Sequence, residues 1–399
     1  MRPLGPVLAP ALGTAVGTVV AVVATSLAAS PASAADSWDV PRSASLTVKG
    51  HGYGHGRGMS QYGAEGAARE GLGWRQITDF YYPGTSRGRV GGRIRVHVSA
   101  DTTDDLVVVP RSGLTVTDLG TDTTLTLPDR DTHRWRVVRS GSGHRVQWQR
   151  GTRWRTWRTL SGNGVFAASG EPVRLVTPGG ARAYRGTLTA VPLSGGRVTV
   201  NTVNLESYLR GVVPLEMPAL WSPAAVRAQA VAARTYAAYE RAHPRSSAFD
   251  VYDTTASQVY GGVGAEHSAS DAAIRATRRR ILEHDGAAAF TQFSSSNGGW
   301  SVRGSVPYQR ARRDPYDDWS GNPVHAWSVT VSDATFERAW PALGNLRRIR
   351  VVGRDGNGEW GGRVTRMRLV GSRSSVSVSG DTMRSALGLR STWVTFRVR

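Results

Sequence analysis

Residues 203–218 read VNLESYLRGVVPLEMP, and residues 225–237, a little further along the chain, read AVRAQAVAARTYA. Between the two stretches, Ser222 and Pro223 have the residue types typical of a helix N-cap and of the first residue of a helix. The run that follows is rich in alanine, the strongest helix former, and it contains no glycine or proline. We therefore expect a helix over 223–241.

Outside this stretch the sequence is largely strand-like. Residues 93–98, RIRVHV, alternate polar and apolar side chains, and Gly, Asp and Pro interrupt the chain at short intervals up to about residue 200. The other elements that the sequence predicts are strands over 197–201, 290–293, 364–370 and 375–379, a helix over 271–283 and a short helix near Asp381. Together these patterns predict an α+β fold that is rich in β-structure.

Tryptophan and arginine are interleaved in the middle of the strand-like region. The residues concerned are Trp135, Trp148, Trp154 and Trp157 among Arg134, Arg136, Arg153, Arg155 and Arg158. Such a pattern can bind single-stranded nucleic acid or stack on sugar rings. It is also typical of a twisted hairpin with cross-strand tryptophan pairs and an exposed arginine face, and we favour this structural interpretation.

The charge balance is strongly basic. Lys and Arg number 50 against 30 Asp and Glu, a net charge of +20, and Lys49 is the only lysine. A surface of this kind attracts polyanions, either nucleic acid or a cell wall that carries carboxylates and phosphates. The chain has no cysteine, which excludes disulfides, thiolate metal sites and a lipid-modified N-terminal cysteine.

The first 34 residues have the pattern of a secretory signal peptide. Arg2 is followed by a long uncharged run rich in Ala, Val and Thr, which ends in Ala32-Ser33-Ala34. An uncleaved membrane anchor is the alternative, but Gly, Ser, Thr and Pro dilute the apolar run. No later stretch is apolar enough to span a bilayer. We expect a secreted, wall-associated protein with no stable membrane anchor after cleavage and no nucleic-acid partner.

Glu216 is a single carboxylate in the apolar frame VVPLEMPALW, with Pro214 and Pro218 on either side. Apolar surroundings raise the pKa of a carboxyl group, so that it can hold a proton near neutral pH. This is what a general acid on a glycosidic oxygen requires. From composition alone, a glutamate at the edge of the core paired with Arg210 or Arg234 is the favoured interpretation.

Three further blocks follow in order: 253–262 (DTTASQVYGG), 293–299 (FSSSNGG) and 387–392 (LGLRST). With 203–218 and 225–237, they resemble the family of stage II sporulation protein D and the LytB amidase enhancer. The resemblance covers about residues 195–399, half of the chain, and consists of several ordered motifs.

The resemblance implies a peptidoglycan lytic transglycosylase in wall remodelling or sporulation. Enzymes of the family cleave glycan strands stripped of stem peptides into 1,6-anhydro ends, and their catalytic glutamate falls at Glu216. Glu206 occupies a more variable motif position and is expected to be structural. The family also implies an alternative, a non-catalytic wall-binding amidase enhancer, with a cell-wall amidase as a candidate partner beside the glycan strands.

Some members of the family hold zinc with Cys and His around the block at 253–262. Here the matching positions are Ala256 and Ser257. We therefore expect neither a metal nor another cofactor, and His267 and His284 are expected to be ordinary surface residues.

A second departure from the family is the order of the blocks. Residues 51–64, HGYGHGRGMSQYGA, resemble a block that usually ends sporulation-type members, as if the domain were circularly permuted. Because a glycine-rich run forms neither a helix nor a core by itself, we expect it to pack beside Glu216. The expected division is a signal peptide 1–34, this Gly/His segment in 35–92, a β-rich Trp/Arg accessory domain 93–194 and a catalytic domain 195–399.

The sequence and the resemblance together yield a set of candidate site residues. Glu216 is the candidate catalytic residue. The candidate substrate-binding residues are Gln229, Arg234 and Tyr236 of the predicted helix, His55, Ser60 and Gln61 of the Gly/His segment, and Ser295 and Ser296 of the block at 293–299.

Overall fold

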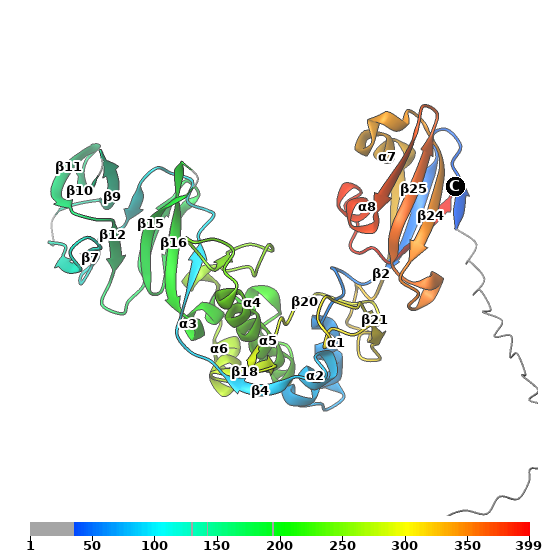
Figure 1. Cartoon of the computed structure of the whole chain (residues 1–399), viewed down its shortest axis with the longest axis horizontal. Coiled ribbons are helices and arrows are strands. Elements are labelled where there is room, and N and C mark those ends of the chain that lie inside the picture. Colours follow the sequence, from blue (N-terminus) through cyan, green and yellow to red (C-terminus); the bar gives the residue numbers. More distant parts are fainter. Residues whose placement is uncertain (1–35, 129–130, 142, 194) are drawn as a thin grey trace, which may run out of the picture. The chain divides into compact units, whose positions relative to one another are not determined.

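The structure is a computed structural model, and it describes residues 36–128, 131–141, 143–193 and 195–399. The predicted signal peptide, residues 1–34, lies outside the described residues. The fold is a mixed α+β structure rich in strands, as the sequence predicts (Figure 1). No helix in the described ranges is both long enough and apolar enough to cross a membrane.

A seven-stranded sheet continues from the predicted accessory region into the predicted catalytic domain. Its strands, in spatial order, are β17 (Val251–Tyr252), β5 (Arg93–His97), β16 (Gly196–Asn204), β15 (Thr187–Leu193), β12 (Gly164–Ala167), β7 (Thr115–Asp118) and β8 (Thr123–Thr126). All neighbours are antiparallel except β17 and β5. β5 and β16 pair directly, so the boundary predicted near residue 195 runs through a single sheet.

The Trp/Arg segment lies in a six-stranded sheet. Its order is β11 (Arg153–Leu160), β10 (Gly143–Arg150), β9 (Arg134–Ser140), β6 (Leu106–Val108), β13 (Val173–Thr177) and β14 (Gly180–Tyr184). Trp148 lies opposite Trp135 in the register, and the buried Trp135 meets Trp157 edge-on with ring centroids 5.6 Å apart. The Arg136 guanidinium lies 4.2 Å from the Trp154 ring centroid. These contacts are those of the hairpin interpretation.

Helices surround the alanine-rich α5, which matches the predicted helix almost residue for residue. The helices of this region are α1 (Gln61–Arg69), α2 (Trp74–Tyr81), α3 (Leu205–Arg210), α4 (Val213–Glu216), α5 (Pro223–Ala242), η1 (Gly262–Ala265) and α6 (Ser268–Ala276). Alanines on α5 allow α1, α2, α3 and α6 to approach it closely. Most of α5 is buried in the larger hydrophobic core, which also includes the inward faces of both large sheets.

Two predicted elements end differently in the structure. The helix predicted over 271–283 is wrong beyond Ala276, because Arg279 turns the chain with φ +62° and Arg280–His284 form strand β18. β18 pairs with β4 (Ser86–Arg89) and with β19 (Ala287–Ala288). The strand predicted over 290–293 is reduced to β20 (Phe293–Ser294), which pairs in parallel with β3 (Met59–Ser60).

The C-terminal region shares a second core with the first strands of the described chain. One sheet has the order β1 (Ser37–Asp39), β24 (Leu346–Arg354), β25 (Val364–Gly371) and β26 (Ser375–Ser379), and another β23 (Ala326–Ser332), β2 (Ser45–His51) and β27 (Val394–Val398). The remaining elements are β21 (Trp300–Ser301), β22 (Arg312–Arg313), α7 (Asp333–Ala339), η2 (Pro341–Leu343), η3 (Glu359–Gly361) and α8 (Gly380–Ala386). The apolar side chains of these two sheets and of α7, η2 and α8 pack with Leu46 and Val48 in this second core. The predicted unit 195–399 therefore contributes to both of the larger hydrophobic cores.

Candidate functional site

Glu216 stands at the end of the one-turn helix α4. Val213 and Met217 are buried beneath it, and Pro214 lies in the first turn of this short helix. These anchors turn the Glu216 side chain toward the loop at 253–260, where its Oε1 accepts a hydrogen bond of 2.9 Å from the Val259 amide. The apolar frame predicted from the sequence therefore serves to fix the direction of one carboxyl group.

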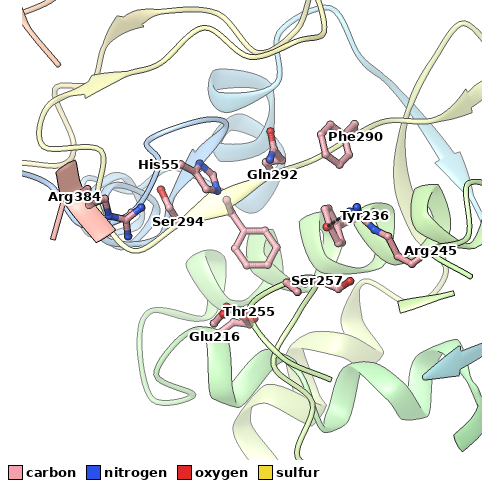
Figure 2. Close-up of a pocket in the computed structure, with 13 residues that line it drawn as sticks. His55, Glu216, Tyr236, Arg245, Thr255, Ser257, Phe290, Gln292, Ser294 and Arg384 are labelled. Atoms are coloured by element: carbon pink, nitrogen blue, oxygen red, sulfur yellow. Dashed lines mark hydrogen bonds between the residues drawn. The ribbon is translucent and has the colours of Figure 1, made fainter. Parts of the chain in front are cut away.

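A pocket of about 450 Å³ opens at Glu216. Figure 2 shows its walls: Glu216 and Thr255 lie on one side, Tyr236 and Arg245 on another, and His55, Ser294 and Arg384 across the pocket from Glu216. Its volume is within the ~300–1,000 Å³ range of small-ligand sites. Among the described residues that line it, Glu216 is the only carboxylate.

Burial raises the pKa of Glu216 above its ordinary value, while hydrogen bonds from the Val259 amide and the Gln61 side chain oppose the rise. No cation pairs with this carboxylate in the described part of the chain. The fully buried Arg234 forms an ion pair with the partly exposed Glu206 at 2.9 Å, and Arg210 pairs with Glu266 and Asp271. The interpretation of Glu216 as the ion-pair partner of Arg210 or Arg234 is therefore wrong.

The Gly/His segment reaches the pocket as a close-fitting extended loop. β3 pairs with β20, and the Tyr53 amide donates to the Ser296 carbonyl at 2.8 Å. At Gly58, with φ +65°, a Cβ would lie 1.9 Å from the Gln292 carbonyl oxygen, so only glycine permits this approach. The alternating glycines thus bring residues 51–60 against the segment 292–298.

His55 is a neutral group at the pocket wall. Burial, and after it the positive charges of Arg57, Arg363 and Arg384, lower the pKa of His55 to about 4. Its Nδ1 faces the Arg57 amide at 3.0 Å and accepts that hydrogen bond, so the ring proton is on Nε2. At neutral pH, His55 is therefore an uncharged hydrogen-bonding group.

Gln61 contacts the Glu216 carboxyl rather than open space. It is buried, it hydrogen-bonds Glu216, and its Nε2 lies 3.5 Å from Oε1 of the fully buried Gln229. Tyr236 lines the pocket, and its hydroxyl lies 3.4 Å from an Arg245 nitrogen. Gln61, with Gln229 behind it, is thus positioned to orient the Glu216 carboxyl, and Tyr236 is positioned to contact a ligand in the pocket.

Six of the eight candidate substrate-binding residues do not line the Glu216 pocket, and of this set only His55 and Tyr236 line it. Gln61 contacts Glu216 instead, Ser295 is the residue after β20, and the other four are buried. Arg234 is fully buried against Glu206, and Gln229 is fully buried behind Gln61. Ser60 and Ser296 are buried and donate to the carboxylate of Asp317 at 2.5 and 2.8 Å. The polar atoms of these side chains form hydrogen bonds with other buried polar groups and are not available to a substrate, so the substrate-binding prediction for these residues needs correction.

The block at 293–299 does contribute to the pocket, but one residue away from the prediction. Phe293 and Ser294, which form β20, line the pocket, whereas Ser295, the residue after the strand, does not. The sequence also did not single out Arg245, Gln292, Phe290, Thr255, Ser257 or Arg384. Thr255 and Ser257 lie inside a quoted block, which is the one signal that could have found them.

Ala256 and Ser257, which replace the metal-binding positions of the resemblance, line the same pocket. Within the described ranges, no group of three or more potential metal-ligating side chains clusters together. His267 caps α6, where its Nδ1 accepts from the Ala269 amide at 3.1 Å, and His284 packs on Tyr308. Both histidines therefore have local structural contacts.

Comparison with known proteins places the site within a recognised domain. Residues 194–284, which include Glu216 and α5, match the family model SpoIID, stage II sporulation protein. The chain is 39% identical to an amidase enhancer of Bacillus subtilis over 130 residues, 31% of this chain and 17% of that protein. It is 28% identical to stage II sporulation protein D of the same species over 236 residues, 51% of this chain and 65% of that protein.

A further relative is stage II sporulation protein D of Bacillus amyloliquefaciens, 27% identical over 216 residues, 48% of this chain and 60% of that protein. The chain thus spans less than two thirds of the length of each of these relatives. We conclude that the chain carries a SpoIID domain and is a relative of stage II sporulation protein D and of the amidase enhancer.

Proposed function

We propose that this protein is a lytic transglycosylase that cleaves the glycan strands of peptidoglycan, with Glu216 as its acid and base. The observation that carries the proposal is a single partly buried carboxyl group with a raised pKa, in a pocket whose described lining offers no second carboxylate. Hydrolytic glycosidases generally use two carboxyl groups roughly 5–9.5 Å apart. One carboxyl group suits a reaction in which the substrate supplies its own nucleophile.

The reaction begins with protonated Glu216. It donates its proton to the glycosidic oxygen as the bond to the anomeric carbon breaks. The 6-hydroxyl of the same sugar attacks that carbon, and the Glu216 carboxylate accepts the hydroxyl proton. The products are a free 4-hydroxyl on one fragment and a 1,6-anhydro ring on the other, and the enzyme regains its protonated acid without consuming water.

The neighbours of Glu216 support both halves of this cycle. Burial favours the protonated form that starts the reaction, and the Val259 amide and Gln61 stabilise the carboxylate that follows proton donation. Tyr236 and Phe290 stack with ring centroids 5.7 Å apart at the pocket wall, a surface suited to the apolar face of a sugar ring. His55 and Ser294 offer neutral hydrogen bonds to sugar hydroxyls.

The proposed place of action is the outside of the cell, at the wall. The signal-peptide pattern of residues 1–34 and the net charge of +20 support this proposal. Peptide carboxylates and wall phosphates are the polyanions that an exported basic protein meets, and they would concentrate it at its substrate.

The decisive experiment incubates the mature protein with purified glycan strands that an amidase has stripped of stem peptides. We expect fragments with 1,6-anhydro ends, identified by mass spectrometry. Glu216→Gln keeps the shape of the side chain and removes the proton, so product formation should fall by about 10²–10⁴-fold. Wild-type turnover in this variant, or fragments with reducing ends only, would rule the proposal out.

A second candidate function is that of a non-catalytic amidase enhancer. It is favoured by the 39% identity to the Bacillus subtilis protein of that name. In that case a cell-wall amidase, mixed with this protein and intact wall, should work faster, and Glu216→Gln should enhance it as well as the unmodified protein does. Enhancement without anhydro products would favour this candidate over the transglycosylase.

A further inference from the structure

The end of the Glu216 pocket that lies at His55 gathers positive charge. Arg384 of α8 lines this pocket, and Arg57 and Arg363 line an adjoining pocket of about 210 Å³ that also has His55 in its wall. All three guanidinium groups act on His55 as positive charges. Figure 2 shows Arg384 on the same side of the pocket as His55 and Ser294, across from Glu216.

These arginines differ from others near the site in having no carboxylate partner. Arg245 is paired with Glu240 and Arg234 with Glu206. For Arg57, Arg363 and Arg384, in contrast, no ion pair is formed with any carboxylate that the structure describes. A positive charge without an ion-pair partner in a partly enclosed position attracts an anionic ligand, although the charges of Asp355 and Asp317 act on Arg363 from nearby.

Arg363 is the most constrained of the three. It is buried, and its Nη2 donates to the Asn297 carbonyl at 2.9 Å, while its Nε has no hydrogen-bond acceptor. Gly56 allows the loop to lie against this guanidinium, since a Cβ there would be 2.5 Å from an Arg363 nitrogen. Burial lowers the pKa of Arg363 to about 10, so the group stays charged at neutral pH.

Two acidic residues line the smaller pocket without neutralising Arg384. The Asp355 Oδ1 accepts from the backbone amides of Asn357 and Arg363 at 3.2 and 3.0 Å, so it is engaged within its own loop. Asp381 is exposed, one turn before Arg384 on α8, and makes no ion pair with it. Neither acid lines the Glu216 pocket, so the charge that faces the ligand there is that of Arg384.

We propose that Arg384, with Arg57 and Arg363 behind it, forms a subsite for an anionic oxygen group carried by the polysaccharide that occupies the Glu216 pocket. This inference rests on the proposed function for the identity of that polysaccharide. Two anionic groups of wall glycans have this chemistry: the lactyl carboxylate of a muramyl sugar, which is free only where the stem peptide has been removed, and a phosphate ester on a sugar hydroxyl. Arginine binds both through paired N–H donors.

The subsite would make the pocket sensitive to the state of the substrate. A stem peptide converts the lactyl carboxylate into an amide, which removes the charge and adds bulk at the position of Arg384. Arg384 would then be a specificity-determining residue, contributed by a helix about 170 positions away from Glu216 in the sequence. It lies beyond residues 194–284, the segment that matches the family model.

Binding is measured on the Glu216→Gln protein, which binds strands without turning them over. The ligands are stripped strands with free lactyl carboxylates, the same strands with these carboxylates converted to primary amides, and amidated strands that carry a 6-phosphate. We expect the free carboxylate or the phosphate to strengthen binding about tenfold over the amidated strand, the scale of one or two charge-assisted hydrogen bonds.

Arg384→Ala in the same background should reduce that ratio to about one while amidated strands bind as before. Arg57→Ala should reduce the ratio in the same direction, and it replaces Arg384→Ala if the latter fails to fold. The matched control is Arg368→Ala, which removes an equal charge from an exposed position on β25 and should keep the ratio. The strand with the higher affinity identifies the anion as carboxylate or phosphate.

Equal affinity for all three strands, or an equal loss in Arg384→Ala and Arg368→Ala, would overturn the subsite. Because turnover plays no part in this measurement, its failure is separate from a failure of the transglycosylase assay. A protein that yields no anhydro ends but prefers anionic strands keeps the subsite and loses the proposed catalysis.

Discussion

Replacing Gln61 by leucine tests how the pocket sets the protonation of Glu216. The Gln61 amide hydrogen-bonds the Glu216 carboxyl and, with the Val259 amide, opposes the rise in pKa that burial causes. Leucine has a similar volume but no donor, so Gln61→Leu removes a stabiliser of the carboxylate and leaves the acid form intact. The pKa of Glu216 should therefore rise further.

The expected size of the shift follows from the strength of one hydrogen bond to a charged group. Such a bond contributes about 1.5 kcal/mol at the lower end of its range, and 1.36 kcal/mol corresponds to one pKa unit, so we expect a rise of about one unit. The Val259 amide remains in place at 2.9 Å, which limits the shift. The buried Gln229 also loses its contact with Gln61, so some loss of stability should accompany the change.

The measurement is the pH dependence of kcat/KM for the release of anhydro ends from stripped strands. A general acid must be protonated, so activity falls as pH rises through its pKa, and this alkaline limb should move upward by about one unit in Gln61→Leu. NMR titration of the labelled Glu216 carboxyl follows the same pKa without turnover. Gln149→Leu on β10, a residue that does not line the pocket, is the control and should leave the limb unchanged.

The outcome that refutes this reasoning is an alkaline limb that stays in place or moves to lower pH while the protein remains folded. An unchanged limb would mean that Gln61 has only a packing role. A lower limb would mean that the hydrogen bond favours the protonated form of Glu216, which would reverse its assigned part in the cycle.

Three further outcomes follow from the site and the fold. The raised pKa of Glu216 means that the folded state binds this proton more tightly than the unfolded state does, and the resulting contribution to stability is complete below about pH 4.5, the ordinary pKa, and is lost as pH rises through the folded pKa. Glu216→Gln should therefore raise the Tm above that of the wild type at neutral pH, and this gain should vanish in acid. A gain in Tm that does not depend on pH would contradict this. Gly58→Ala should lower the free energy of unfolding, measured in urea, by about 3 kcal/mol or more. Gly84 is also at positive φ but has open space around it, so Gly84→Ala should lower the free energy of unfolding by only about 1 kcal/mol. Equal losses in the two variants would show that the contact with Gln292 is unimportant. Retention on purified wall should weaken strongly near 1 M salt, where the screening length falls to ~3 Å, and unchanged retention would exclude the arginine charge as its cause.

Local signals in the sequence were sufficient for the elements whose stability is mainly local. Ser222 and Pro223 mark the start of α5, and its alanines specify both helix and close packing, so its bounds agree with the prediction to one residue. The strands predicted over 364–370 and 375–379 correspond to β25 and β26, because their alternating side chains have one buried face.

The prediction of a helix over 271–283 failed where a distant strand determines the structure. Residues 277–283, TRRRILE, are compatible with a helix, but β4, almost 200 positions earlier, pairs with Arg280–Glu283 and draws them into a sheet. Tertiary pairing overrides local propensity there, and no pattern within the segment records it.

The same distinction separates the site residues that were found from those that were missed. Glu216 could be found because its apolar frame and its motif are contiguous in sequence. Arg234 was misassigned because the sequence does not show that its side chain is fully buried or that it pairs with Glu206 at 2.9 Å. Arg384 has no motif of its own, and it gains significance only because the second core, built from both ends of the described chain, brings α8 to the His55 end of the pocket. The family model matches only residues 194–284, so part of the wall of the Glu216 pocket, including Arg384, is supplied by residues outside that match.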